Sequence, residues 1–149
     1  MRYSDSYDNE GFVPDNINSR WESFNANPKH SRVGDCTVRA ISIALNQDWY
    51  STYVDLCVEG LKLADMPSAD AVWGQYLKRK GFKRSIVPCD GLCTTVREFC
   101  EDNPTGTYIV CPKGHLVAIV NGRYLDTWDS GDENIIYFWK KEENEEHER

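Results

Sequence analysis

The sequence predicts an α+β domain in which helices come first and an antiparallel β-sheet follows. Apolar residues recur mostly at helical spacing over 36–102, whereas 107–139 consists of short runs rich in β-branched and aromatic residues. Between two of these runs stands Asn121-Gly122, which is typical of a two-residue type I′ hairpin turn. These observations indicate a sheet built from hairpins and covered by helices.

Each expected helix has a residue that favours its start. Asp35 is the expected N-cap of the first helix, which is apolar around most of its circumference and is therefore expected to be central and buried. Ser51 and Ser68 are expected to cap the second and third helices, and Thr94 or Thr95 opens the fourth. The expected helices are 36–46, 51–63, 69–80 and 94 or 95 to 102, and the expected strands are 82–87, 107–111, 115–120, 123–128 and 135–139.

Length and composition indicate one soluble domain. The 149 residues are 40% hydrophobic and 28% charged, which is ordinary for a globular protein. We expect an arm at 1–29 that packs on or flanks the domain, the domain itself at 30–139, and an acidic disordered tail at 140–149. The net charge of −7 argues against nucleic acid as a partner, because phosphates attract clustered Lys and Arg.

No apolar run has the length of a membrane span or the features of a secretory signal, so a cytoplasmic protein is expected without a membrane partner. In that compartment free thiols are favoured over disulfides for the six cysteines. A zinc site would use the four later cysteines, but only one close pair is present, so neither a metal nor another cofactor is expected. Those four are Cys89, Cys93, Cys100 and Cys111.

Cys36 stands in the first turn of the predicted central helix. The positive end of the helix dipole favours a thiolate there, and the free backbone N–H groups of a helix start can bind a developing oxyanion. These are the properties of a cysteine nucleophile. The alternative is that Cys36 is a small buried core residue, which is common for a free cysteine.

The expected hairpin turn fixes which side chains lie near His115. If Asn121 and Gly122 are the turn residues, His115 and Asp126 are diagonal neighbours on one side, roughly 7–8 Å apart at Cα. Asp129 would point the other way. The register therefore selects Asp126 over Asp129 as the carboxylate that orients His115 as a general base. Read separately, His115 could also be an ordinary strand residue and Asp126 an ordinary carboxylate near a turn.

The order of a cysteine at a helix start, a histidine on a strand and an acidic residue on the next strand resembles the papain-like cysteine peptidase superfamily. Asp126-Thr127-Trp128 looks like the Asn-Ser-Trp of papain, so the resemblance implies that Trp128 covers the bond between the histidine and its partner. Asp35-Cys36 and Gly114-His115 resemble the compact bacteriocin-processing peptidases. The motifs together are similar to small uncharacterised papain-like proteins of bacteria and their phages.

The resemblance also implies an oxyanion-hole donor six residues before the cysteine. Papain-type enzymes have Gln there, whereas this sequence has His30. A histidine can donate a hydrogen bond, so His30 is the expected substitute, and Asn25 or Asn27 could also supply the donor. The reading in which His30 is a loop residue without a role stays open.

The expected function is that of a cysteine hydrolase acting on a peptide or isopeptide bond in a protein or peptide substrate. Cys36 would attack the carbonyl, His115 would serve as base and then acid, and Asp126 would orient it. The thioester would then be hydrolysed, or passed to an amine in a transferase. The alternative is an inactive papain-like binding module, for instance a phage-encoded protein that binds a host protein. Metal binding by the later cysteines is a third reading.

Overall fold

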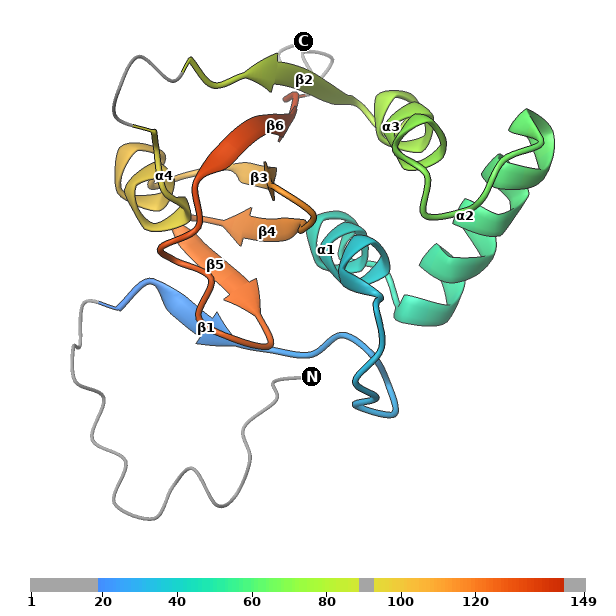
Figure 1. The fold of residues 1–149 in the computed structure, drawn as a ribbon, viewed down its shortest axis with the longest axis horizontal. Helices are drawn as coiled ribbons and strands as arrows, with labels where there is room; N and C mark the ends of the chain where they lie inside the picture. Colours follow the sequence, from blue (N-terminus) through green and yellow to red (C-terminus); the bar gives the residue numbers. More distant parts are fainter. Residues whose placement is uncertain (1–18, 89–92, 144–149) are drawn as a thin grey trace, which may run out of the picture.

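The structure is a computed structural model that describes residues 19–88 and 93–143 (Figure 1). In this part the chain forms an α+β fold, as predicted, with four helices and a six-stranded sheet. The helices are α1 (Cys36–Leu45), α2 (Trp49–Leu63), α3 (Asp70–Arg79) and α4 (Val96–Asp102). The strands are β1 (Trp21–Ser23), β2 (Phe82–Ile86), β3 (Thr107–Pro112), β4 (Val117–Val120), β5 (Arg123–Asp126) and β6 (Ile135–Lys141).

The sheet is mixed, so the expectation of a wholly antiparallel sheet is wrong. Its strand order is β1-β5-β4-β3-β6-β2, and every neighbouring pair is antiparallel except β1 and β5, which run parallel. Strand β1 belongs to the N-terminal arm and contains only three residues, too few for the alternation that identifies a strand. The arm therefore joins the sheet as an edge strand.

The β4–β5 hairpin has the predicted register. Val120 pairs with Arg123, and the turn residues Asn121 and Gly122 have φ of 49° and 76°, as a type I′ turn requires. The strands are shorter than expected, because β4 begins at Val117 and β5 ends at Asp126. His115 consequently lies in the loop before β4, and the sheet ends where the candidate site begins.

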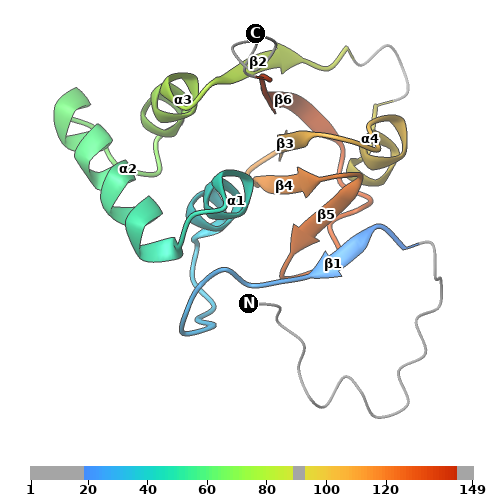
Figure 2. The same cartoon turned by 180° about the vertical axis from the view of Figure 1, so that it is seen from behind.

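Each face of the sheet carries its own apolar core (Figures 1 and 2). Helices α1, α2 and α3 pack on one face, where β3 contributes Ile109 and Cys111. Helix α4 packs on the other face, where the same strand contributes Tyr108 and Val110. The alternation along β3 is the period of two that a strand covered on both faces requires.

Helix α1 is central, as its all-round apolar sequence predicts: Ala40, Ile41 and Ala44 are buried between the sheet and the other helices. Asp35 is its N-cap residue, but its side chain makes no capping hydrogen bond. The carboxylate instead accepts hydrogen bonds from other side chains, one of them from Arg39 one turn later. The predicted N-cap position is therefore confirmed, but the side chain makes no capping bond, because the carboxylate bonds to a cation instead.

The starts of the later helices differ from those expected. Asp48 caps α2, and Ser51 donates to it from inside the helix, so the cap expected at Ser51 lies three residues too late. Helix α3 has Ala69 as its N-cap instead of Ser68. Helix α4 begins after Thr95, one of the two predicted residues, which forms a capping box with Glu98.

The boundaries of the arm and the tail also move. The arm is described from Ser19 onward, and β6 continues to Lys141, two residues into the range expected to be a disordered tail. Lys140 and Lys141 pair with β2, which explains why they are ordered despite the acidic sequence that follows. No helix among residues 19–88 and 93–143 is both long and apolar enough to cross a membrane.

Candidate active site

Cys36 is the first residue of α1, and its half-buried side chain faces His115. The first backbone hydrogen bond of the helix runs from Arg39 N–H to Asp35 C=O, so the N–H of Cys36 precedes the helical ladder. The backbone N–H of Leu116 donates to the sulfur from the loop before β4. The thiol thus lies where α1 meets the sheet.

His115 contacts Asp126 as the hairpin register predicts. Its Nε2 lies 2.7 Å from Oδ2 of Asp126, and both side chains are almost wholly shielded from solvent. Because Nε2 is engaged by the carboxylate, Nδ1 is the ring nitrogen left for Cys36. Asp129, the rejected candidate, accepts instead from the hydroxyl of Tyr124 and lies beside Arg97.

His115 contacts Asp126, the last residue of β5, from the loop before β4. His115 precedes β4 in a turn in which its N–H donates to Pro112 C=O, so its assignment to a strand is wrong although its partner is right. Strand β1 holds the backbone of Asp126: Trp21 Nε1 and Phe24 N–H both donate to the Asp126 carbonyl, at 3.2 and 3.0 Å. The arm therefore helps to position the carboxylate.

The Asp126 carboxylate, 2% exposed, accepts several further hydrogen bonds. Ser130 Oγ donates to Oδ2 at 2.7 Å, and the backbone N–H of Thr127 donates to Oδ1 at 2.8 Å. An Arg39 guanidinium nitrogen lies 3.3 Å from Oδ1 and also donates to Thr127 Oγ1. Such a set of donors stabilises an ionised carboxylate that faces His115.

Arg39 links this carboxylate to the one before Cys36. Its Nε donates to Asp35 Oδ1 at 2.8 Å, while its terminal nitrogen reaches Asp126. The second oxygen of Asp35 accepts from Asn27 Nδ2 and Trp49 Nε1, at 3.1 and 3.0 Å. Two buried carboxylates on either side of the Cys36–His115 pair are thus joined through one guanidinium.

The electrostatics of the site favour a thiolate beside an imidazolium. Burial by itself would raise the pKa of the Cys36 thiol, but the His115 side chain, the Leu116 N–H and the positive charge of Arg39 outweigh it and lower the pKa. Burial opposes the imidazolium too, yet the bond to Asp126 and the neighbouring Cys36 raise the pKa of His115 to about 9. A lowered thiol pKa next to a raised imidazole pKa is the arrangement of an activated cysteine.

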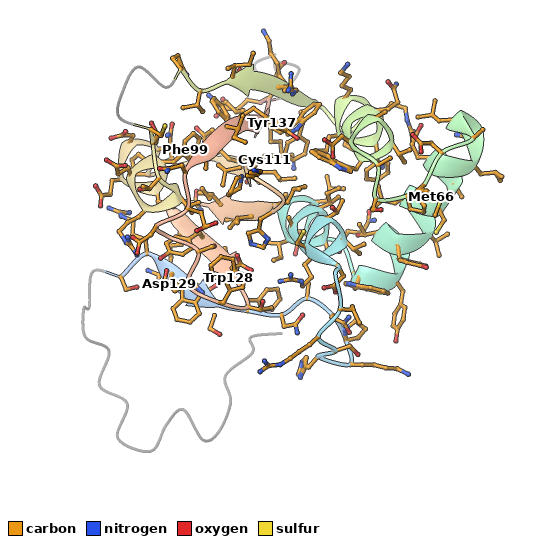
Figure 3. The ribbon with its side chains drawn as sticks, in the orientation of Figure 1. Met66, Phe99, Cys111, Trp128, Asp129 and Tyr137 are labelled. Carbon is orange, nitrogen blue, oxygen red and sulfur yellow. The ribbon has the colours of Figure 1, made fainter. Side chains whose placement is uncertain are left out.

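Trp128 lies over the imidazole, as the resemblance implied. Its ring centroid is 5.2 Å from that of His115, and the two rings are tilted by 36°. Figure 3 shows Trp128 beside Asp129 in the loop that follows β5. The indole is 44% exposed, so it covers the ring from the solvent side.

A cavity of about 260 Å³ opens beside the site. Residues of the arm and of the loop before α1 line it together with the charged network and the indole. Its walls include Asn25, His30, Asp35, Arg39, Thr127 and Trp128.

The three residues considered for the oxyanion hole differ in what they can do. Asn27 is committed to the fold, because its Nδ2 donates to Asp35 and its Oδ1 accepts from Lys29 N–H. Asn25 accepts a hydrogen bond from the backbone N–H of Asn27 and lines the smaller cavity. His30 lines the same cavity and has a left-handed backbone conformation with φ of 52°. His30 and Asn25 therefore stay candidates, and Asn27 does not.

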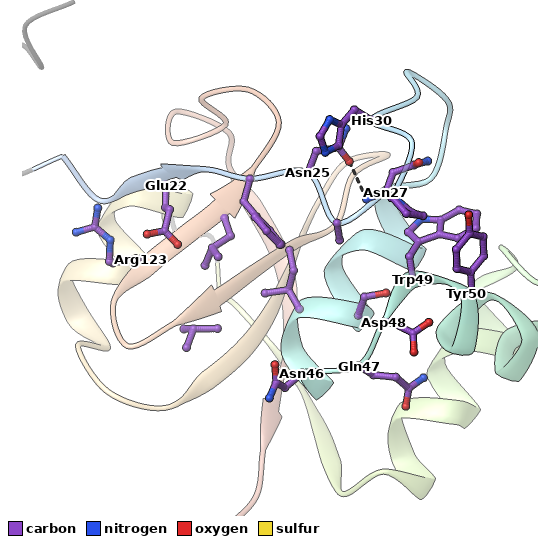
Figure 4. A pocket seen from close by; sticks show the side chains of 17 residues that line it. Glu22, Asn25, Asn27, His30, Asn46, Gln47, Asp48, Trp49, Tyr50 and Arg123 are labelled. Atoms are coloured by element: carbon purple, nitrogen blue, oxygen red, sulfur yellow. Dashed lines mark hydrogen bonds between the residues drawn. The ribbon is translucent and has the colours of Figure 1, made fainter. Parts of the chain in front are cut away.

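A second, larger cavity of about 610 Å³ lies on the other side of the arm, against the carboxyl end of α1 (Figure 4). Asn25 and His30 line both cavities, so the arm separates them. From the sequence, substrate specificity is expected in the arm and in the loops 64–70 and 88–94. The arm lines both cavities, the described residues of the two loops line neither, and 89–92 lies outside the described residues.

The later cysteines do not form a cluster in the described part of the chain. Cys100 is buried on the α4 face of the sheet and Cys111 on the α1 face, and burial raises the pKa of each thiol to about 12. Cys93 is disulfide-bonded, so the expectation of free thiols is wrong there, since it came from the compartment and not from local geometry. Within 19–88 and 93–143, no group of three potential ligands gathers as around a metal ion.

Two residues of the site were not expected from the sequence. The charged side chain of Arg39 would be expected on the exposed side of a helix. Its position one turn after Cys36 instead places it beside the site. Ser130 follows a strand in a polar loop, and no spacing rule connects it to Asp126. Only the loop conformation brings its hydroxyl to the carboxylate.

Comparison with known proteins adds no family: no protein-family model, curated protein or solved structure matches this chain. The likeness to papain-like peptidases therefore stays a prediction from the motifs.

Proposed function

We propose that this protein is a cysteine hydrolase that cleaves an amide bond, in a peptide or an isopeptide, through a thioester intermediate. The observation that supports this most is one continuous arrangement: the Cys36 thiol at a helix start, the His115 imidazole against it, and Asp126 2.7 Å from the far ring nitrogen. Nucleophile, base and orienting carboxylate are the roles that amide hydrolysis through a thioester needs.

The proposed reaction has two halves. The Cys36 thiolate attacks the carbonyl carbon. The resulting oxyanion accepts one hydrogen bond from the Cys36 backbone N–H and another from the side chain of His30 or Asn25. Imidazolium Nδ1–H of His115 then protonates the leaving amine as the C–N bond breaks, which leaves a thioester. Water next gives its proton to His115 and attacks the thioester, so that the acid is released and the thiolate returns. Asp126 holds the ring in position throughout.

The first test is cleavage of a peptide mixture, with new termini identified by mass spectrometry. The wild-type chain should generate termini that Cys36→Ala does not, because the thioester cannot form without the sulfur. Asp129→Asn is the matched control for Asp126→Asn, since Asp129 is three residues further along the chain and its carboxylate bonds to Tyr124 instead of His115. Cleavage at full rate by Cys36→Ala would exclude the proposal.

The second test is thiol reactivity and needs no substrate. Iodoacetamide should alkylate Cys36 at pH 6 at least about tenfold faster than Cys57, the half-buried thiol of α2, because the Cys36 pKa is lowered. In His115→Gln the Cys36 rate should fall and its titration should move to higher pH, since the imidazolium that stabilises the thiolate is gone. Equal rates for Cys36 and Cys57 would instead favour the inactive binding module.

A further inference from the structure

Helix α2 exposes a continuous apolar surface. Tyr50 is 54% exposed, Val54 57% and Leu61 81%, and Tyr53 and Val58 beside them are nearly half exposed. The opposite side of the helix is buried against the rest of the protein. Its buried residues are Thr52, Leu56, Glu59 and Gly60. Helix α2 therefore carries a row of apolar side chains on the side that faces away from the domain.

The spacing on this outer side is that of a helix–helix seam. Tyr50, Val54, Cys57 and Leu61 follow one another at intervals of four, three and four, which places them in one line along the helix. We call these four residues the α2 seam. A single exposed Leu needs no explanation, but a line of apolar residues over about three helical turns is the pattern that a partner helix covers.

The seam is open in the part of the chain that the structure describes. In both views α2 lies at the edge of the molecule, beyond α1 and α3, and none of the other drawn elements covers its outer side (Figures 1 and 2). The ring of Tyr53 stacks on Trp49, with centroids 5.1 Å apart, and this holds one flank of the seam in place. Because these side chains are already ordered, less side-chain conformational entropy is lost when a partner binds.

We propose that the α2 seam binds the α2 seam of a second copy of this chain, with the two helices antiparallel. A twofold axis across the middle of the seam sets Tyr50 opposite Leu61 and Val54 opposite Cys57, so each layer pairs apolar residues with apolar residues. The two helix dipoles are then also antiparallel, which is the favourable arrangement.

The exposed apolar area is close to what a specific dimer needs. The five exposed apolar side chains expose on the order of 100 Å² each, so two copies that cover all of them bury roughly 1,000 Å², about the area that a specific interface should reach. A lipid surface fits less well, because an interfacial helix presents Lys and Arg on its polar side. Here that side is packed inside the protein and carries Glu59, which pairs with Arg79.

Sedimentation velocity of the full chain, at protein concentrations from about 1 to about 100 µM, measures the monomer–dimer equilibrium and so tests the proposal. The wild type should form dimers, and Leu61→Glu should weaken dimerisation at least tenfold, because a charge would be buried in the seam. Ile86→Glu is the matched control, since Ile86 is 70% exposed on β2, and it should dimerise as the wild type does. Circular dichroism verifies that both variants are folded.

A cysteine cross-link tests the register. In a Cys36→Ser background, Val54→Cys places a thiol opposite Cys57 of the second copy, so mild oxidation should give a covalent dimer on a non-reducing gel. Adding Cys57→Ser should abolish that dimer. A monomer at every concentration, or a dimer that Leu61→Glu leaves intact, overturns the proposal. A Leu61→Glu-sensitive dimer without the cross-link overturns the antiparallel register.

Discussion

Arg39 illustrates how one side chain connects two functions of the site. It neutralises Asp35 and Asp126, both buried, and its positive charge also lowers the Cys36 pKa. A guanidinium suits this place because its planar fork can donate to two carboxylates at once, whereas an ammonium is a single point of charge. Stability and thiol activation are therefore coupled at this residue.

Replacing Arg39 by Met should lower the free energy of unfolding by about 3 kcal/mol, because two buried carboxylates lose their shared cation. Arg39→Lys should lose less, since it keeps the charge but cannot reach both carboxylates. Urea denaturation measures both. Arg32→Met is the control: Arg32 is exposed and lines the same small cavity, so its loss should cost under about 0.5 kcal/mol. Equal losses at the two positions would contradict the bridging role.

At the scale of elements, the β4–β5 hairpin decides the site. Its turn places Asp126 on the strand beside the loop that carries His115, and a shift of one residue would move Asp126 to the other face. The short strand β1 adds to this by pairing with β5 and holding the Asp126 carbonyl. One local turn and one distant strand together position the carboxylate.

Gly122→Ala should destabilise the protein by about 1–2 kcal/mol, because Gly122 has φ of 76°, where a side chain is strained. An added Cβ would also lie 3.0 Å from the Arg20 guanidinium and 3.1 Å from Pro104 Cα. Thermal unfolding measures the change. Gly34→Ala serves as the control, since no atom lies within 4 Å of its added Cβ, and a loss as large there would show that the turn is not special.

The whole molecule is a sheet with a core on each face, and both cores contain a buried thiol, Cys100 on one side and Cys111 on the other. The arm contributes an edge strand and the end of β6 pairs with β2, so the sheet extends past both expected limits of the domain at 30 and 139. Apolar burial on two faces also explains why these thiols stay protonated.

The Cys111 thiol should make the protein sensitive to alkali. Burial raises its pKa from 9.0 to about 12, so the folded state keeps a proton that the unfolded chain loses. Its contribution to stability is complete below pH 9 and declines as the pH rises toward 12. Between pH 8 and 10 the wild type should lose about 1.4 kcal/mol more than Cys111→Ala in urea denaturation. Cys57→Ala, which alters a half-buried thiol, should lose as much as the wild type. Identical losses for wild type and Cys111→Ala would contradict this assignment.

Local sequence was enough for features that depend on neighbours along the chain. Asn121-Gly122 determined a turn and hence a register, and the apolar circumference after Cys36 determined a central helix. The contact of His115 with Asp126, and not with Asp129, follows from that register alone. These predictions succeed because the period of a strand and the geometry of a two-residue turn leave little freedom.

Only the tertiary structure decided which groups far apart in the chain meet. Strand β1 is too short to show a period, and Ser130 is one polar loop residue among several. The sequence indicates an N-cap at Asp35, but only the fold brings Arg39, Asn27 and Trp49 to its carboxylate. A buried charge takes whichever donors the packing brings within reach, and packing is a property of the whole fold. The sequence by itself therefore determined the helix that begins at Cys36 and the partner of His115, whereas the fold determined which donors and charges surround them.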